Sequence, residues 1–185
     1  MAMLVLLNGP PASGKSTIAR RLTAARPLSL CLDVDVVRGL LGNWLESPTE
    51  AGLAARSLAI AMARAHLQEG RDVIVPQVLG RPDFIEQLAA VAAERQVAFV
   101  EVALVVDRTV ARRAFDVRSA MPADGTHEDA AALIERSTSA DPLGDMFDRY
   151  DDLVEHRSSA HRIEVVWGDV DATIARVDEV LVGRR

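Results

Sequence analysis

The sequence is poor in cysteine, lysine and aromatic residues, and it has no long hydrophobic run. Cys31 is the only cysteine among 185 residues, so no internal disulfide can form. No apolar run reaches the roughly 18 residues of a membrane-spanning helix, so none is expected. Residues 1–3 lead directly into an apolar strand pattern, and we expect no signal peptide. These absences predict a cytoplasmic protein without a membrane partner.

Basic charge is also scarce. The formal net charge is −6, and Lys15 is the only lysine in the chain. An acidic surface repels polyanions at long range, so long nucleic acids are not expected partners. The arginines of the central region, Arg56, Arg64 and Arg71, are scattered along a predicted helix and its end, where we expect them to face water.

Length and composition favour one domain spanning residues 1–185, with a monomer or homodimer as the expected state. Hydrophobic residues make up 49% of the chain and aromatics only 4%, so the predicted core is aliphatic. We find no internal repeat and no low-complexity tract.

One stretch near the start carries a phosphate-binding motif. It fits the P-loop pattern G-x-x-x-x-G-K-[ST] and consists of Gly9, Pro10, Pro11, Ala12, Ser13, Gly14, Lys15, Ser16 and Thr17. An apolar strand pattern at residues 4–7 precedes it and a helical pattern follows, which is the context that the motif requires. Its backbone N–H groups and the helix N-terminus favour an anion. Lys15 can reach the β- and γ-phosphates, and Ser16 can ligate Mg²⁺, so the motif predicts a nucleoside triphosphate site.

A second polar group follows the next predicted strand, residues 28–32. Asp33 and Asp35 come at its carboxyl end, where open α/β sheets place their ligands. If a helix begins near Asp35, then Asp35 and Arg38 share a face three residues apart. The alternative interpretation is a helix N-cap with a surface ion pair.

The remaining pattern predicts alternating helices and strands. A helix beginning at Ser47–Pro48, with a capping box to Glu50, is expected to bury Leu53, Leu58 and Met62. Further strands are predicted at residues 72–76, 97–106 and 163–167, with Gln77 at the end of the first of these. Helices are predicted to open at residues 81–83, 126–129 and 141–142 and after 168–171. The order predicts an α/β fold whose five-stranded parallel sheet has helices on both faces.

The segment after the fourth strand predicts a helical lid, approximately residues 108–140. Asp107 is interpreted as a helix cap, with a Mg²⁺-binding Walker B acid as the alternative. Arg112, Arg113 and Arg118 cluster on the following helix, next to a loop-like stretch at residues 119–126. The three arginines are either lid residues or a solvated helix face.

These features together resemble a family of small P-loop kinases. The P-loop, Asp35-x-x-Arg38 and the arginine-rich helix are similar to those of 5′-hydroxyl polynucleotide kinases, zeta-toxin-like proteins and chloramphenicol phosphotransferase, a group broadly described as AAA-type ATP-binding proteins. Gluconate kinase is similar in the same places. The resemblance implies the P-loop NTPase fold. No guanine-recognition motif or ABC-type signature is present, so a GTPase or ABC-type ATPase is not expected.

The resemblance also implies roles for particular residues. Lys15 and Ser16 would bind ATP and Mg²⁺, Asp35 would be the general base, and Arg38 would steer the acceptor. Arg112, Arg113 and Arg118 would meet phosphates as lid arginines. Asp33 would either orient Mg²⁺ waters or shield Asp35 from solvent, and the loop at Gly168, Asp169 and Val170 would lie near the adenine. Polynucleotide kinases have an acid where this chain has Gln77, which disfavours a nucleic-acid acceptor.

The sequence therefore predicts an ATP-dependent phosphotransferase acting on a hydroxyl of a small molecule, such as a sugar, nucleoside or antibiotic. The segment at Trp44 and Leu45 could enclose a compact acceptor. Two alternatives stay open at this point: a 5′-hydroxyl polynucleotide kinase, and a regulatory ATPase without a small-molecule acceptor.

Overall fold

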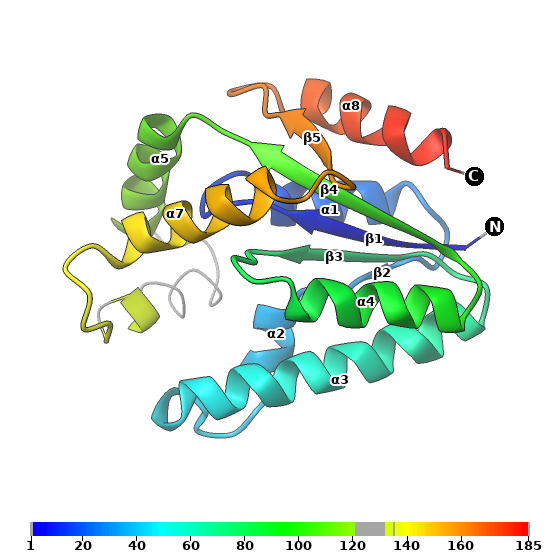
Figure 1. Ribbon diagram of the computed structural model, residues 1–185, viewed down its shortest axis with the longest axis horizontal. Coiled ribbons are helices and arrows are strands. Elements are labelled where there is room, and N and C mark those ends of the chain that lie inside the picture. The colour runs from blue at the N-terminus through cyan, green and yellow to red at the C-terminus, as the bar shows by residue number, and fades with distance from the viewer. Residues whose placement is uncertain (1, 121–131, 135, 185) are drawn as a thin grey trace.

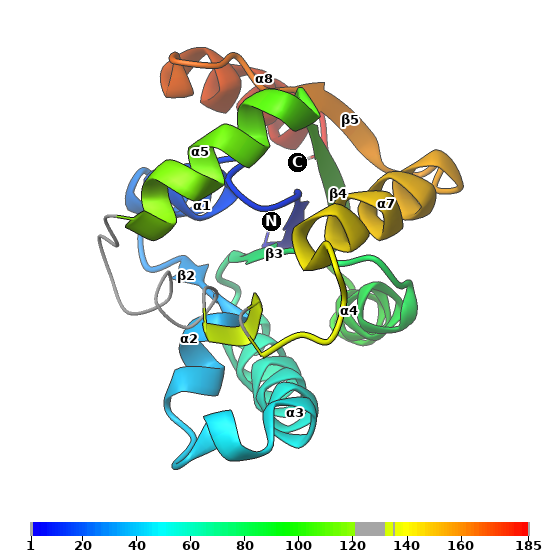
Figure 2. The ribbon, with the colours of Figure 1, turned by 90° about the vertical axis from the view of Figure 1, so that its left-hand side faces the viewer.

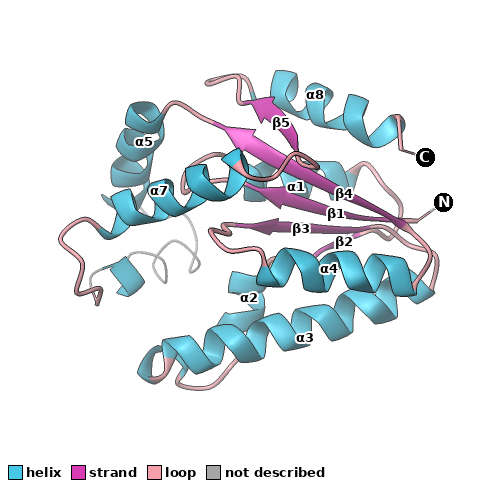
Figure 3. Ribbon diagram, in the orientation of Figure 1, coloured by secondary structure: helices cyan, strands magenta, loops and turns pink. Residues whose placement is uncertain are grey.

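The computed structural model describes residues 2–120, 132–134 and 136–184, which form an α/β fold around one parallel sheet (Figure 1). The strand order is β2-β3-β1-β4-β5, and every neighbouring pair is parallel. The strands, shown in magenta in Figure 3, are β1 (Met3–Asn8), β2 (Leu30–Cys31), β3 (Val73–Gln77), β4 (Ala98–Val105) and β5 (His161–Glu164). The predicted five-stranded parallel sheet is confirmed.

Helices cover both faces of this sheet. They are α1 (Lys15–Ala24), α2 (Val34–Gly39), α3 (Pro48–Gln68), α4 (Asp83–Glu94), α5 (Arg108–Ala120), α7 (Pro142–Glu155) and α8 (Val170–Val182), with a short 3₁₀ helix, η1 (Trp44–Glu46). In the described part of the chain, no helix combines the length and apolar character that a membrane crossing needs.

The central strand β1 explains why its sequence is a continuous apolar run. Leu4 and Leu6 pack on one face of the sheet with residues of α3 and α4, whereas Val5 and Leu7 pack on the other with residues of α1 and α8. Each of these four side chains has 0% exposure. A strand buried on both faces cannot alternate apolar and polar residues, so its sequence reads as an apolar run.

The carboxyl ends of the strands face one end of the molecule, where α2, α5 and α7 surround them (Figure 2). Asn8, the last residue of β1, lies in register between Gln77 of β3 and Ala103 of β4. The P-loop leaves β1 at this edge, with β3 and β2 on one side and β4 and β5 on the other. Ligands of open α/β sheets bind at such an edge, outside the carboxyl ends of the strands.

Helix α3 differs from its prediction in the face that it buries. The buried stripe is Ala51, Ala55, Ala59, Ala63 and Leu67. The predicted core residues Leu53, Leu58 and Met62 are instead 61%, 46% and 41% exposed. Alanines four residues apart lie on one face of a helix, and their small side chains let α3 approach its neighbours closely. The buried face of α3 is therefore the one with small side chains and not the one with the largest apolar side chains.

Three smaller expectations also need correction. The Ser47 side chain makes no capping hydrogen bond, although Pro48 does begin α3 as predicted. Leu28 has φ 56° and is not part of β2, which is therefore shorter than predicted. Strand β5 ends at Glu164, before the predicted end at Trp167. The helix predicted to open at residues 126–129 lies outside the described residues.

Candidate active site

The P-loop is a tight turn between β1 and α1. Ala12 and Gly14 have φ values of 61° and 82°, in the left-handed region, and Gly14 lies directly before the first residue of α1. A side chain at Gly9 would place its Cβ 2.5 Å from Ser13 Oγ, so the buried Ser13 side chain would have to move to admit one. The loop therefore brings its backbone against the start of a helix, which is the arrangement that binds phosphate.

Lys15, the first residue of α1, lies among charged groups from other elements. Burial lowers the pKa of its ammonium group, while the carboxylates of Asp35 and Asp33 raise it, and the Arg118 guanidinium lowers it. These four side chains come from α1, from the start of α2 and from α5. The structure thus brings together charges that are up to 103 residues apart in the sequence.

Asp33 links the P-loop helix to α2. Its Oδ1 accepts a hydrogen bond from the Asp35 backbone N–H at 3.0 Å, so Asp33 is the N-cap of α2. Its Oδ2 accepts from Ser16 Oγ at 3.3 Å. Burial, followed by the nearby Asp35 carboxylate, raises the pKa of Asp33.

Ser16 and Asp33 form an oxygen-donor pair of the kind that suits Mg²⁺. This hard cation uses one or two protein oxygens together with substrate phosphates and waters. The described residues contain no group of three or more His, Cys, Asp or Glu side chains that could hold a metal ion. A Mg²⁺ ion at Ser16 and Asp33 would therefore depend on nucleotide phosphates for its remaining ligands.

Asp35 and Arg38 share a face of α2, as the sequence predicted. Their side chains form an ion pair with Arg38 Nη1 2.8 Å from Asp35 Oδ1. The Arg38 guanidinium also lies over the Trp44 ring, 4.4 Å from its centroid. The Trp44 ring and the Asp35 carboxylate together orient the Arg38 guanidinium. The N-cap at Asp33 and the ion pair between Asp35 and Arg38 are the features of the alternative interpretation, and both are present.

One cavity of about 620 Å³ brings the predicted site together. Its lining includes Lys15, Ser16, Asp33, Asp35, Arg38 and Arg118. Buried Gln77 also lines it, and its Oε1 finds no hydrogen-bond partner among the described residues. The volume falls within the approximately 300–1,000 Å³ of small-molecule sites.

Other predicted residues lie apart from this cavity. Arg113 lines a second cavity, of about 750 Å³, between α5 and Trp167, which Arg118 also lines. Arg112 forms an exposed ion pair with Asp141 and lines neither cavity. Asp169 is the N-cap of α8 and accepts from the Ala172 N–H at 2.9 Å. Their roles toward a nucleotide stay predictions.

Asp107 has the cap geometry that the sequence favoured. Its Oδ1 accepts a hydrogen bond from the Val110 backbone N–H at 2.9 Å, at the start of α5. Asp141 likewise caps α7, accepting from the Gly144 N–H at 3.0 Å. The carboxylate of Asp107 is thus engaged by the helix that follows it.

Sequence reasoning missed several residues of the site. Arg56, which was expected to face water, lines the main cavity together with Met146 and Arg149 of α7. Arg56 lies next to Ala55 of the buried stripe, so its position depends on which face of α3 is buried. Once the alanine spacing identifies that face, Arg56 is the arginine that borders it.

Asn8 is a further residue that the motif did not reveal. Its side chain accepts from the Leu79 N–H at 2.9 Å and donates to the Leu79 carbonyl at 3.3 Å. Tyr150 of α7 donates to the Leu104 carbonyl at 2.9 Å, and burial raises the pKa of its hydroxyl. These buried hydrogen bonds fix the loop after β3 and helix α7 against the ends of β1 and β4.

A family model described as "AAA domain" matches residues 4–143. The chain belongs to this AAA-domain family. A search of curated proteins finds no matching relative.

Solved structures share the fold of this AAA-domain chain at low sequence identity. Shikimate kinase from Bacteroides thetaiotaomicron is 16% identical with a TM-score of 0.63, covering 97% of this chain and 98% of its own. APS kinase from Mycobacterium tuberculosis, solved with AMPPNP and APS, is 17% identical with a TM-score of 0.60 and 98% of both chains covered. A gluconokinase from Sinorhizobium meliloti 1021 is 16% identical with a TM-score of 0.59, covering 98% and 96%. The fold is therefore that of small P-loop kinases.

Proposed function

We propose that this protein is an ATP-dependent kinase that transfers the γ-phosphate to a hydroxyl of a small molecule. The observation that carries the proposal is the shared cavity: the P-loop residues Lys15 and Ser16 line it together with Asp35 and Arg38. A nucleotide on the P-loop and an acceptor beside Asp35 would therefore occupy one enclosed space. The kinase names of the structures with the same fold support this proposal.

The P-loop would hold the phosphates of ATP. Lys15 would contact the β- and γ-phosphates; burial lowers the pKa of its ammonium group, and the carboxylates of Asp35 and Asp33 oppose that shift. Ser16 and Asp33 would hold Mg²⁺, which neutralises charge on the phosphates. The Ser16–Asp33 hydrogen bond already places these two oxygens beside each other.

Asp35 would take the proton of the acceptor hydroxyl. In this step the hydroxyl oxygen forms a bond to the γ-phosphorus, the bond from that phosphorus to the β–γ bridging oxygen breaks, and ADP leaves. Asp35 accepts the hydroxyl proton, as a positioned carboxylate can. Arg38 would hold the Asp35 carboxylate in place through the 2.8 Å ion pair. Helix α2 follows directly after β2 at the carboxyl edge of the sheet. This short helix therefore places Asp35 and Arg38 at the cavity.

The second cavity would take the adenine. It lies between α5 and Trp167, next to the loop that the family resemblance associates with the base. Arg118 lines both cavities, so it would contact the phosphates of a nucleotide that extends from the second cavity into the main one. Some described residues of the predicted lid, among them Phe115 and Ile134, line the main cavity, which supports a lid role for this region.

The proposal is tested by replacing Asp35 with asparagine, with Asp152→Asn as a control on the exposed surface of α7. We expect Asp35→Asn to lower acceptor phosphorylation by roughly 10²-fold or more, the scale for losing a general base. The affinity for ATP should change little, and Asp152→Asn should behave like the wild type. If ATP binding collapses in Asp35→Asn while transfer is spared, Asp35 is a metal ligand or structural cap and the proposed mechanism is wrong.

A further inference from the structure

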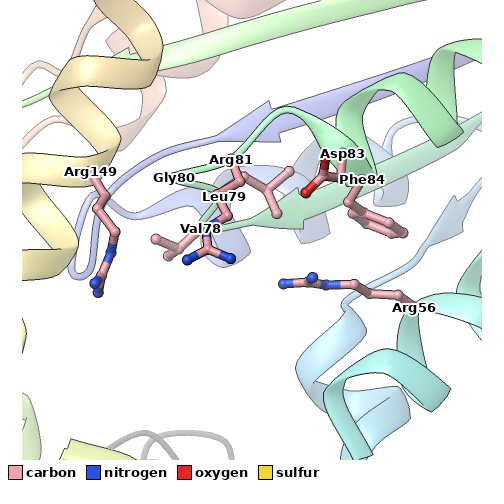
Figure 4. A pocket seen from close by; sticks show the side chains of 8 residues that line it. All are labelled: Arg56, Val78, Leu79, Gly80, Arg81, Asp83, Phe84 and Arg149. Atoms are coloured by element: carbon pink, nitrogen blue, oxygen red, sulfur yellow. The ribbon is translucent and has the colours of Figure 1, made fainter. Parts of the chain in front are cut away.

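Three arginines from three different elements line a small cavity beside the candidate active site (Figure 4). Arg56 comes from α3, Arg81 from the loop between β3 and α4, and Arg149 from α7. Figure 4 shows the Arg56 side chain pointing toward the guanidinium of Arg81, with Arg149 on the other side of the cavity. Since like charges repel, such a gathering needs compensation by negative charge.

The protein compensates this charge only in part. The one carboxylate that lines the cavity is that of Asp83, which leaves two net positive charges. Arg56 lies over the Phe84 ring, 5.7 Å from its centroid, and none of the three arginines forms a salt bridge or side-chain hydrogen bond with a described residue. The side chains of Phe84 and the other apolar lining residues offer the guanidinium groups no hydrogen-bond acceptor. The cavity is therefore electrostatically suited to an anion.

The size and position of this cavity indicate what kind of anion it takes. Its volume is about 260 Å³, slightly below the approximately 300–1,000 Å³ range of whole-ligand sites, so it suits one group of a larger ligand. Arg56 and Arg149 also line the main cavity with Lys15 and Asp35. An acceptor whose hydroxyl lies at Asp35 could thus place a second group among the arginines.

The loop that carries Arg81 is held firmly in place. Leu79 of this loop exchanges two hydrogen bonds with the buried Asn8 side chain at the end of β1. At Gly80 the loop approaches α7 so closely that a Cβ would lie 2.7 Å from Arg149 Cβ. These contacts fix the backbone positions from which Arg81 and Arg149 extend, so the arrangement is a built site and not a chance gathering of surface side chains.

We propose that this cavity binds a phosphate monoester of the acceptor, so that the kinase acts on a hydroxyl of a molecule that already carries a phosphate. The proposal rests on the proposed kinase function. A phosphate monoester carries about −1.5 to −2 charges at neutral pH, which matches the two net positive charges. A carboxylate carries one, and would leave one guanidinium uncompensated. Each planar guanidinium can also donate two parallel hydrogen bonds to phosphate oxygens.

The test measures binding of inorganic phosphate by isothermal titration calorimetry at pH 8, with saturating Mg²⁺ and AMPPNP so that the P-loop is occupied. Arg56→Gln, Arg81→Gln and Arg149→Gln each keep a polar, unbranched side chain, although a shorter one, and remove its positive charge. Arg71→Gln, in the turn before β3 at the opposite edge of the sheet, is the matched control. We expect each of the three variants to weaken phosphate binding about tenfold, the control to leave it unchanged, and acetate to bind more weakly than phosphate.

Failure of this proposal is separable from failure of the kinase proposal. The Lys15→Ala variant lacks the P-loop anion site. If this variant still binds phosphate without nucleotide, and if the binding still depends on Arg56 and Arg149, the result supports the arginine site independently of the kinase proposal. If the wild type does not bind AMPPNP, the result counts against the kinase proposal only. Equal phosphate affinity in the wild type and the three variants, or no phosphate binding by the wild type at millimolar concentration, overturns the arginine site. Arg81 is exposed on a loop, so its variant remains informative even if Arg56→Gln fails to fold.

Discussion

Replacing Arg157 with methionine is expected to destabilise the fold strongly, because it would leave a carboxylate buried without a cation. Glu101 lies in the middle of β4, and its side chain is only 4% exposed. Arg157, just after α7, donates to both of its carboxylate oxygens at 2.8 and 2.9 Å. The same guanidinium also reaches Glu86 of α4 at 2.8 Å, so it joins α4 and the end of α7 to the sheet.

The magnitude follows from the burial of each partner. Removing one partner of a buried ion pair costs about 3–5 kcal/mol. The Glu86 contact adds little, because the Glu86 side chain is 62% exposed and solvent screens it. Each kcal/mol lowers the melting temperature of a chain of this size by about 2–4 °C, so Arg157→Met should lower it by about 6–20 °C. The double variant Glu101→Leu/Arg157→Met removes both charges and should come within about 1–2 kcal/mol of the wild type or exceed it.

Urea unfolding followed by circular dichroism measures these free energies for the wild type, both single variants and the double variant. The cycle should give a coupling energy of roughly 2 kcal/mol or more between the two side chains. Glu101→Leu should cost less than Arg157→Met, because Arg157 keeps Glu86 and is 17% exposed. A cost below about 1 kcal/mol for Arg157→Met, or a double variant whose cost is the sum of the singles, would refute the reasoning.

Three further predictions concern residues of the site. Asn8→Ala should lower the free energy of unfolding by about 1–3 kcal/mol in urea titrations, since it leaves the buried Leu79 N–H unpaired; a loss under about 0.5 kcal/mol would contradict this. Asp33 has a raised pKa, so its ionised form costs stability as pH rises through that pKa. Asp33→Asn should therefore be more stable than the wild type at pH 7, with the gain vanishing in acid; equal midpoints at both pH values would count against it. Lys15→Ala should lose the rise in melting temperature that Mg²⁺–ATP gives the wild type, without unfolding.

The sequence was most informative where local chemistry alone decides the structure. The P-loop glycines, the apolar run of β1 and the pair Asp35 and Arg38 each depend on residues within a few positions of one another. The same holds for the caps at Asp107 and Asp141, where a carboxylate accepts from an N–H three residues on. Such contacts are favoured because the partners lie close together in the chain, although Ser47, which makes no capping hydrogen bond, shows that proximity alone does not ensure them.

Prediction failed where the packing of distant elements decides. For α3, large apolar residues suggested one face, whereas close approach selected the alanine stripe at Ala51, Ala55, Ala59 and Ala63. That change also moved Arg56 from the expected solvent face to the cavity. Arg149 lines the same cavity through α7, 93 residues later, and no local pattern connects the two.

The candidate site shows the same division. Ser16 was predicted to ligate Mg²⁺ and Asp33 either to orient its waters or to shield Asp35, and the structure places Ser16 and Asp33 in hydrogen-bond contact. No local pattern indicates the role of Asn8, because that role depends on Leu79, 71 residues away in the sequence. Arg112 was grouped with Arg113 and Arg118 by sequence proximity, yet Arg112 pairs with Asp141, whereas Arg118 lies near Lys15. Neighbouring positions on one helix face different partners, and only the fold reveals which.

The central claim is that the chain transfers phosphate from ATP to a small hydroxyl compound at Asp35. The most direct measurement incubates the protein with ATP labelled at the γ-phosphate and a small-molecule cell extract, and identifies the labelled products by mass spectrometry. The account predicts label in a phosphorylated small molecule with the wild type and its loss with Asp35→Asn. Label found only in inorganic phosphate, or transferred to the 5′ end of an added oligonucleotide and not to a small molecule, would contradict it.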